Sequence, residues 1–267
     1  MPVGTIPGRR RDVGGRHELG QNFLVDRRVV DHLVGYVPCD PLPVVELGPG
    51  DGVITDRLVA DRPKKVTVVE IDPRRAERLR GRFRNRVRVV RGDMLSYRLD
   101  EPHHVVSNVP FGITTPLLRH LLGQRTWRSA ALLLQWEVAR KRAAIGGTTL
   151  LTASWWPWYD FALGGRVPSA AFRPRPSVDG GILLLARRPT ALVPPGERAA
   201  YQRLVTAAFR GHRLVHAVRD VVPAARRWAA NEDLPSTVRA RDLTAQQWVS
   251  LHRAAAPRPR RSARSRR

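Results

Sequence analysis

The sequence predicts an α/β fold built on a parallel, doubly wound sheet, followed by a small helical domain. Two observations carry this prediction. Short β-rich runs alternate with helix-like stretches through most of the chain, a pattern typical of parallel strands joined by helices. Prolines and a glycine between positions 189 and 196 then interrupt the chain, and apolar residues recur at helical spacing beyond them.

The expected elements follow one another in a regular order. Apolar residues from Phe23 to Val34 suit a short helix packed on a larger body. The expected parallel strands are Val44–Leu47, Val66–Glu70, Val87–Val90, His104–Ser107 and Ala130–Leu134. The runs Trp158–Val167 and Gly181–Ala186 have no clear helix between them, so we expect an antiparallel pair that closes the sheet. Helical spacing then appears from Tyr201 to Ala208 and continues through Leu214 to Val218.

We therefore expect four segments. Residues 1–16 are a flexible basic arm, 17–188 the sheet domain, 189–256 the helical domain and 257–267 a disordered, Arg-rich tail. The first 16 residues lack the apolar stretch of a signal peptide, and no apolar run approaches the roughly 20 residues that span a bilayer. The single cysteine, Cys39, cannot form an internal disulfide, which fits a cytoplasmic location.

The charge indicates a polyanionic partner. The chain has 47 Lys and Arg residues against 23 Asp and Glu, a formal net charge of +24. Nearly all the basic residues are arginines, whose planar guanidinium pairs with phosphate and stacks on bases. A high-GC genome would also favour arginine, but codon bias does not account for the net charge. The balance favours nucleic acid as the partner and disfavours most protein substrates.

A glycine-rich turn and two acids predict a site for a nucleoside-containing cofactor. Gly48, Gly50 and Gly52 follow the first strand, where a ligand is able to approach the backbone. Glu70 ends the second strand and is placed to accept hydrogen bonds from ribose hydroxyls. Asp93 follows the third strand and is placed to bind an adenine amino group. The alternatives are a glycine turn made for packing and an Asp93 that caps a helix or turn.

Two apolar residues complete this expected site. Ile71 and Met94 are expected to sandwich the adenine ring. The loop has the spacing GxGxG instead of the GxGxxG of dinucleotide-binding loops, which favours S-adenosyl-L-methionine over a dinucleotide. The chemistry inferred below needs no metal, and we predict no metal site.

The motif Asn108-Val109-Pro110-Phe111 after the fourth strand predicts a site for a flipped base. The exocyclic amine of adenine is a poor nucleophile because its lone pair is delocalised into the ring. The Asn108 side-chain oxygen and the Pro110 carbonyl are suited to accept hydrogen bonds from that amine, and Phe111 is suited to stack on the base. The alternative is a structural Asn-x-Pro turn with a buried Phe111.

Together these motifs resemble those of the ribosomal RNA adenine N6-dimethyltransferase family. The resemblance covers roughly residues 16 to 250. The matching motifs are His17–Asp26, Glu46–Gly52, Glu70–Asp72, Gly92–Asp93, Asn108–Phe111, Gln135–Arg140 and Phe172–Asp179. It implies a Rossmann-like class I methyltransferase sheet over 17–188, a helical RNA-binding domain over 189–256, and ribosomal RNA as the partner of a monomeric enzyme.

The resemblance also implies roles for individual residues. Gln21, Asn22 and Leu24 would close over the methionine end of the cofactor. Gly48 and Gly50 would line it, and Asn108 would touch both cofactor and target. The segments 135–140 and 172–178 would frame the opening for the target base.

Within the family, three features favour the erythromycin-resistance 23S rRNA methylases. Phe111 stands where the housekeeping 16S rRNA dimethylases usually have Tyr, and Val178–Leu183 and the basic tail resemble the resistance branch. Asp51 departs from the Lys common at this position in both branches. The function expected is methylation of an adenine N6 in 23S rRNA, with resistance to macrolides, lincosamides and streptogramin B.

Three other functions stay open at this stage. They are a housekeeping 16S rRNA dimethylase, a non-catalytic nucleic-acid-binding protein on the same fold, and an amino-methyltransferase that acts on DNA or protein.

Overall fold

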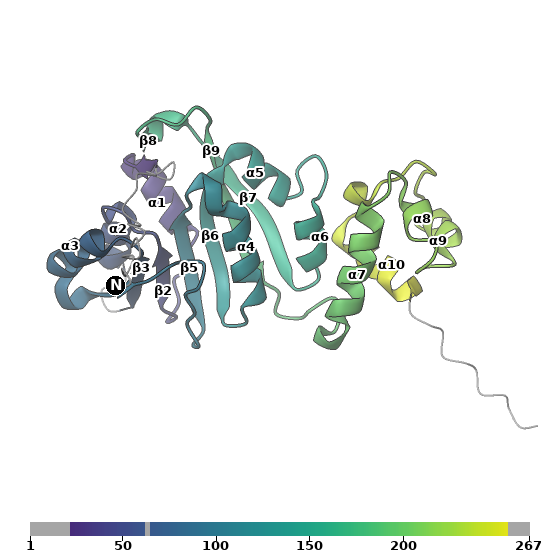
Figure 1. The fold of residues 1–267 in the computed structure, drawn as a ribbon, viewed down its shortest axis with the longest axis horizontal. Coiled ribbons are helices and arrows are strands. Elements are labelled where there is room, and N and C mark those ends of the chain that lie inside the picture. The colour runs from purple at the N-terminus through teal and green to yellow at the C-terminus, as the bar shows by residue number, and fades with distance from the viewer. Residues whose placement is uncertain (1–21, 62–64, 256–267) are drawn as a thin grey trace, which may run out of the picture.

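A seven-stranded sheet forms the centre of the molecule, and a group of C-terminal helices extends from its edge (Figure 1). The computed structural model describes residues 22–61 and 65–255. The strands are β2 (Val44–Leu47), β3 (Val66–Glu70), β4 (Val87–Arg91), β5 (His103–Asn108), β6 (Trp127–Gln135), β7 (Tyr159–Val167) and β9 (Gly180–Arg187). A separate two-stranded sheet pairs β1 (Phe23–Leu24) with β8 (Phe172–Arg173).

The strand order is β4-β3-β2-β5-β6-β9-β7. The first five strands in this order run parallel, and β9 is antiparallel to both of its neighbours, β6 and β7. The five parallel strands and the antiparallel pair expected from the sequence are therefore confirmed. The chain proceeds outward from β2 to β4 and then returns to place β5 on the other side of β2. Such a reversal of strand order leaves a crevice at the carboxyl ends of the strands.

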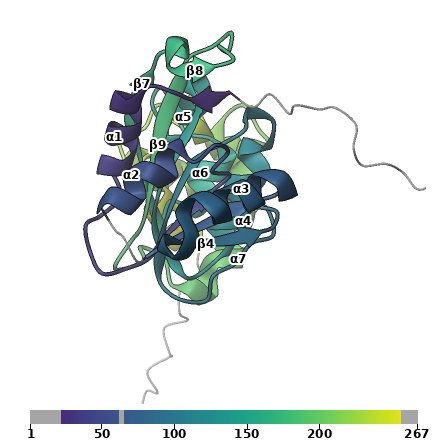
Figure 2. The same cartoon turned by 90° about the vertical axis from the view of Figure 1, so that its left-hand side faces the viewer.

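Helices cover both faces of the sheet (Figure 2). One face carries α1 (Arg27–Gly35), α2 (Val53–Asp61) and α3 (Pro73–Phe83), and the other carries α4 (Thr114–Gly123), α5 (Trp136–Arg142) and α6 (Leu150–Trp155). Successive residues of a strand point to opposite faces, so Val44 packs with the first group and Val45 with the second. Burial on both faces explains why the central strands β2 and β3 are mostly apolar in sequence.

The helix expected to include Phe23 and Leu24 is shorter than predicted. These two residues form β1 and pair with β8, and the Val25 amide donates to the Ala171 carbonyl at 2.9 Å. The side chain of Asp26 accepts a hydrogen bond from the Arg28 amide at 2.9 Å, so it caps α1, which begins at Arg27. The apolar spacing could not reveal a strand whose partner lies almost 150 residues away in the sequence.

The C-terminal helices pack directly on the sheet portion. They are α7 (Arg198–Phe209), α8 (Leu214–Ala217), α9 (Ala225–Asn231) and α10 (Ala245–Ala255). Tyr201 is fully buried, and its hydroxyl donates to the Ala153 carbonyl of α6 at 2.8 Å. The apolar pattern after Ala208 belongs to a separate helix, because the chain turns closely at Gly211, where a Cβ would lie 2.7 Å from that of Ala217.

The C-terminal helices share one continuous hydrophobic cluster with the sheet. The predicted boundary after residue 188, between a sheet domain and a helical domain, therefore stays a prediction. Within the described residues, no helix is both long enough and apolar enough to cross a membrane. The predicted arm 1–16 and tail 257–267 lie outside the described residues.

Candidate cofactor and target-base site

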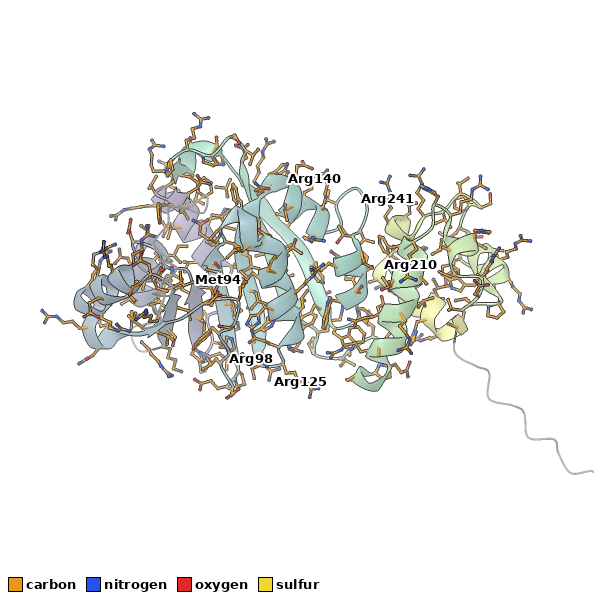
Figure 3. The ribbon with its side chains drawn as sticks, viewed as in Figure 1. Met94, Arg98, Arg125, Arg140, Arg210 and Arg241 are labelled. Carbon is orange, nitrogen blue, oxygen red and sulfur yellow. The ribbon has the colours of Figure 1, made fainter. Side chains whose placement is uncertain are left out.

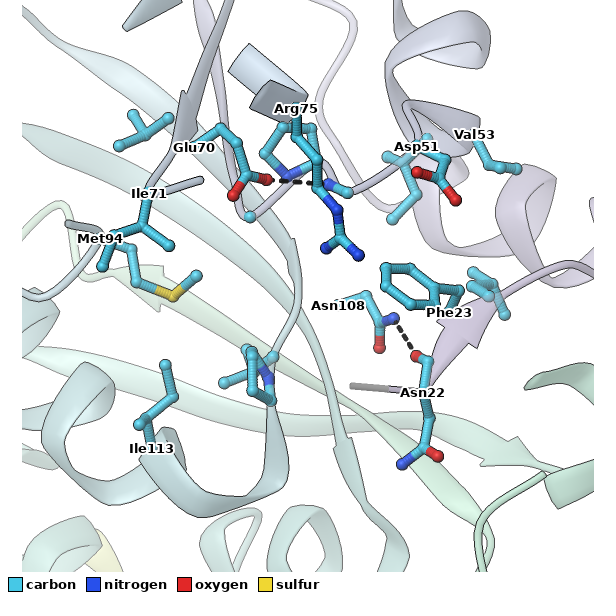
Figure 4. Close-up of a pocket in the computed structure, with 18 of the residues that line it drawn as sticks. Asn22, Phe23, Asp51, Val53, Glu70, Ile71, Arg75, Met94, Asn108 and Ile113 are labelled. Atoms are coloured by element: carbon cyan, nitrogen blue, oxygen red, sulfur yellow. Dashed lines mark hydrogen bonds between the residues drawn. The ribbon is translucent and has the colours of Figure 1, made fainter. Parts of the chain in front are cut away.

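A cavity of about 270 Å³ lies where the order of the strands reverses, at the carboxyl ends of β2, β3 and β5 (Figure 4). Five chain segments line it. They are the β1 strand with its flanks, the loop after β2 with the start of α2, the turn after β3, the turn after β4 and the turn after β5, which together supply Asn22–Val25, Gly48–Asp51 with Val53 and Ile54, Val69–Ile71 with Arg75, Gly92–Leu95, and Asn108–Ile113 without Gly112. Of the predicted site residues, only Gln21 lies outside the described residues; the others all line this one cavity.

The loop after β2 requires glycine at the two positions that line the cavity. Gly48 has φ +70° and Gly50 has φ +55°, a region that side chains rarely adopt. A Cβ on Gly48 would lie 2.7 Å from Met94 Cε, and one on Gly50 would lie 3.0 Å from Phe23 Cε1. Gly52 serves packing, because its own Cβ would meet Leu79 of α3 at 3.1 Å. The loop therefore leaves bare backbone facing the cavity, as a bulky ligand requires.

Glu70 is fixed at the end of β3 by two backbone amides. Its Oε1 accepts from the Asp72 amide at 2.9 Å and its Oε2 accepts from the Gly50 amide at 3.2 Å (Figure 4). The side chain is buried and lines the cavity. A carboxylate oxygen has more than one lone pair, so both oxygens are able to accept further hydrogen bonds from ligand hydroxyls. Glu70 therefore links the glycine loop to the β3 turn and presents a preorganised acceptor.

The three residues expected around an adenine ring lie at one end of the cavity. Ile71 is 60% exposed and lies beside Met94, as Figure 4 shows. Asp93 forms a turn, because its Oδ1 accepts from the Leu95 amide at 2.8 Å. Among the described residues its Oδ2 has no hydrogen-bond partner, so the turn role does not prevent this oxygen from accepting a hydrogen bond from a ligand. An apolar pair with a nearby acceptor suits a flat ring that carries an amino group.

Asn108 is oriented by a contact with the segment before β1. Its Nδ2 donates to the Asn22 backbone carbonyl at 2.8 Å, which leaves Oδ1 to face the cavity (Figure 4). The preceding Ser107 hydroxyl donates to the Leu47 carbonyl at 2.6 Å and holds β5 against β2. The side-chain oxygen of Asn108 is therefore left as a hydrogen-bond acceptor at the wall of the cavity.

The turn after Asn108 is rigid, but one expected acceptor in it is already in use. The Pro110 carbonyl accepts from the Ile113 amide at 3.1 Å, which closes the short helix Phe111–Ile113. This carbonyl keeps a second lone pair for a ligand. Phe111 is half-buried and lines the cavity, so its ring is not part of the closed core. That position contradicts the alternative of a structural turn with a buried Phe111.

Glu46, in the strand that precedes the glycine loop, is fully buried beneath the site. The Thr55 hydroxyl donates to its Oε2 at 2.5 Å, and its Oε1 has no partner among the described residues. Burial, aided by the negative charge of Glu70 and against the Thr55 hydrogen bond, raises the pKa of Glu46 to about 8. The Glu46 carboxyl is therefore protonated and uncharged at neutral pH, so it places no second negative charge beside Glu70.

Among the lining residues that sequence reasoning missed are the aromatic Phe23 and the charged Asp51 and Arg75. The Arg75 guanidinium stacks over the Phe23 ring, 4.6 Å from its centroid. No local signal distinguishes Arg75, because it is one of five arginines between positions 74 and 82. In the described residues, no three His, Cys, Asp or Glu side chains are placed to hold a metal ion.

The model of the family described as ribosomal RNA adenine dimethylase matches residues 14–256. The chain belongs to this family. It is similar to the mycinamicin-resistance protein MyrB of Micromonospora griseorubida, with 52% identity over 90% of this chain and 79% of that protein. It is also similar to an rRNA adenine N-6-methyltransferase of Corynebacterium diphtheriae, with 43% identity over 73% of this chain and 78% of that protein.

A solved structure agrees with this assignment. The crystal structure of the 23S rRNA methyltransferase ErmE has a TM-score of 0.79 and 30% identity, and the match covers 88% of this chain and 99% of that one. The protein is thus an rRNA adenine N6-methyltransferase with a Rossmann-like class I sheet, and its cofactor is S-adenosyl-L-methionine. The cavity fits this cofactor, because a Cβ-free loop, a carboxylate at the end of β3 and an apolar pair meet in it.

Proposed function

We propose that the protein methylates the N6 of an adenine in 23S rRNA and thereby confers resistance to macrolides, lincosamides and streptogramin B. The observation that carries the proposal is the 52% identity to a mycinamicin-resistance protein over most of both chains. The similarity to ErmE along nearly all of that chain supports the same substrate. The 16S rRNA alternative has no comparable support in the cavity, where Phe111 occupies the place of the usual housekeeping Tyr.

We propose the following roles for the residues that hold the cofactor. Glu70 accepts hydrogen bonds from the ribose hydroxyls, and Asp93 accepts one from the adenine amino group through Oδ2, which has no partner within the described part of the chain. Ile71 and Met94 sandwich the ring, and the backbone of Gly48 and Gly50 lies against the cofactor. Asn22, Leu24 and, outside the described residues, Gln21 close the methionine end. Bound S-adenosyl-L-methionine supplies a methyl group already activated by a sulfonium centre.

The remaining chemistry belongs to the turn after β5. The Asn108 Oδ1 accepts a hydrogen bond from the target amine and draws its lone pair out of conjugation with the ring. The second lone pair of the Pro110 carbonyl accepts from the other N–H, and Phe111 stacks on the flipped base. Because Asn108 is already fixed by Asn22, the acceptor is in place before the base arrives. A merely RNA-binding relative would not need this arrangement, which favours catalysis over the non-catalytic alternative.

The arginine-rich surface is proposed to bind the RNA backbone. Exposed arginines lie on both parts of the molecule, for example Arg98 and Arg125 on the sheet portion and Arg210 and Arg241 on the helical portion (Figure 3). We propose that 17–188 carries the methyltransferase site, that 189–256 binds RNA, and that the segments 1–16 and 257–267 add charge. The enzyme is proposed to act as a monomer in the cytoplasm.

Primer extension tests the choice of substrate. The gene is expressed in a macrolide-sensitive bacterium, and reverse transcription is run on both 23S and 16S rRNA. A dimethylated adenine blocks base pairing, so the wild-type protein is expected to produce a stop in 23S rRNA together with growth on erythromycin. Asn108→Ala serves as the control and is expected to remove both. A stop confined to 16S rRNA would overturn the proposed substrate.

A further inference from the structure

The charges around the cavity are unequal. Three acids line it, Asp51, Glu70 and Asp93, but among the described residues the only basic side chain in its wall is that of Arg75. Figure 4 shows the Arg75 guanidinium pointing into the cavity. The ligand that fits this wall therefore carries more positive than negative charge and places its negative group near Arg75.

Arg75 is held in this position by the start of α3. The Asp72 side chain caps the helix by accepting from the Arg74 amide at 2.7 Å and the Arg75 amide at 3.1 Å. Residue 75 therefore lies in the first helical turn, directly beyond the β3 end that carries Glu70. From there the half-buried side chain extends over the Phe23 ring, 4.6 Å from its centroid.

The stack on Phe23 places the guanidinium away from the adenine end. Ile71 and Met94 lie at one side of the cavity, whereas Phe23 and Asn22 lie at the other (Figure 4). Phe23 also packs against Gly50, where a Cβ would approach its ring to 3.0 Å. On the residue roles proposed above, which place the adenine ring between Ile71 and Met94 and the ribose at Glu70, the amino-acid portion of the cofactor would extend toward Phe23 and Asn108.

We propose that Arg75 binds the α-carboxylate of the methionine portion of S-adenosyl-L-methionine. This carboxylate is the one anionic group of the cofactor, whose sulfonium and ammonium groups are both positive. A guanidinium is able to hold a carboxylate by two parallel hydrogen bonds, and the stack on Phe23 limits the freedom that such a bond would otherwise cost. The pairing accounts for the one arginine in a described wall whose other charged side chains are all acidic.

Calorimetry with two cofactor analogues separates this role from a structural one. S-adenosylhomocysteine has the carboxylate, whereas 5′-methylthioadenosine has the same adenine, ribose and sulfur without the amino-acid portion. Arg75→Met keeps a long stem over Phe23 and removes the charge. It is expected to weaken S-adenosylhomocysteine binding about 10- to 100-fold, the effect of losing hydrogen bonds between charged groups. Its affinity for 5′-methylthioadenosine is expected to change little.

Two further variants complete the design. Arg74→Met removes the same charge from the neighbouring exposed position and is expected to leave both affinities as in wild type. Arg75→Lys retains the charge without the planar fork and is expected to bind S-adenosylhomocysteine with intermediate affinity. Equal losses for both analogues in Arg75→Met would mean that Arg75 only shapes the pocket, and an unchanged affinity for S-adenosylhomocysteine would mean that the carboxylate binds elsewhere. Either result overturns the proposal, and neither involves RNA, so the 23S assignment is tested separately.

Discussion

The buried carboxyl of Glu46 makes the stability of the fold depend on pH, and Glu46→Gln should remove that dependence. The side chain is fully buried under the glycine loop, with one oxygen bonded to the Thr55 hydroxyl and the other without a partner among the described residues. Glutamine has almost the same shape and retains an oxygen that accepts from Thr55. The substitution therefore changes little except that the side chain no longer ionises.

The expected magnitude follows from the two pKa values of Glu46. Burial raises the pKa from 4.5 to about 8 in the folded protein. Between these values the unfolded chain releases the proton and the folded chain keeps it, so each pH unit lowers the free energy of unfolding by about 1.4 kcal/mol. At pH 7 the loss amounts to about 3 kcal/mol, a large part of the stability of a typical protein. Above the folded-state pKa both states are ionised, and the loss levels off.

Urea denaturation followed by circular dichroism, from about pH 5 to about pH 8, measures this effect. The quantity of interest is the unfolding free energy of Glu46→Gln minus that of wild type, in which the titration of other groups cancels. This difference is expected to grow with pH in favour of the variant. Glu77→Gln, which removes an exposed carboxylate from α3, is the control, and its difference should be nearly independent of pH. A difference for Glu46→Gln that does not change with pH would refute the reasoning.

Other predictions concern the site and the basic surface. Glu70→Gln, which loses one acceptor and the charge, is expected to weaken S-adenosyl-L-methionine binding by about 1–3 kcal/mol in calorimetry, and wild-type affinity would exclude the ribose contact. Asn108→Ala is expected to lower turnover in a methyl-transfer assay by about 10²–10³, and a wild-type rate would rule out its acceptor role. Phe111→Tyr should retain activity, whereas Phe111→Ala should lose about 1–3 kcal/mol of interaction with the target base. If circular dichroism shows that the Ala variant is unfolded, Phe111 is a core residue and the stacking role is wrong. The logarithm of the RNA association constant should fall linearly with the logarithm of the salt concentration. Deletion of residues 257–267 should make this slope less steep, and an unchanged slope would mean that the tail makes no phosphate contacts.

Local signals in the sequence were sufficient for the sheet and for selecting side chains that, within the described residues, line one cavity. The strands β2 and β3 have the predicted bounds, because runs buried on both faces are mostly apolar and these two end beside a glycine or at an acidic residue. Gly48, Glu70, Asp93 and Asn108 were recognisable for a related reason. Each ends a strand or follows one within two residues, and the carboxyl ends of parallel strands meet at one edge of a sheet.

The tertiary structure decided whatever depends on partners distant in the sequence. Phe23 and Leu24 have helical spacing, but they form a strand because β8 offers them backbone hydrogen bonds. That pairing brings Asn22 to Asn108 and Phe23 to Arg75, so the orientation of the Asn108 amide and the position of the only basic side chain in the described wall of the cavity both depend on it. The sequence does not distinguish Arg75 from the neighbouring arginines. The periodicity of apolar residues predicts which face of a helix a residue occupies, but it does not predict which distant side chain the residue will contact.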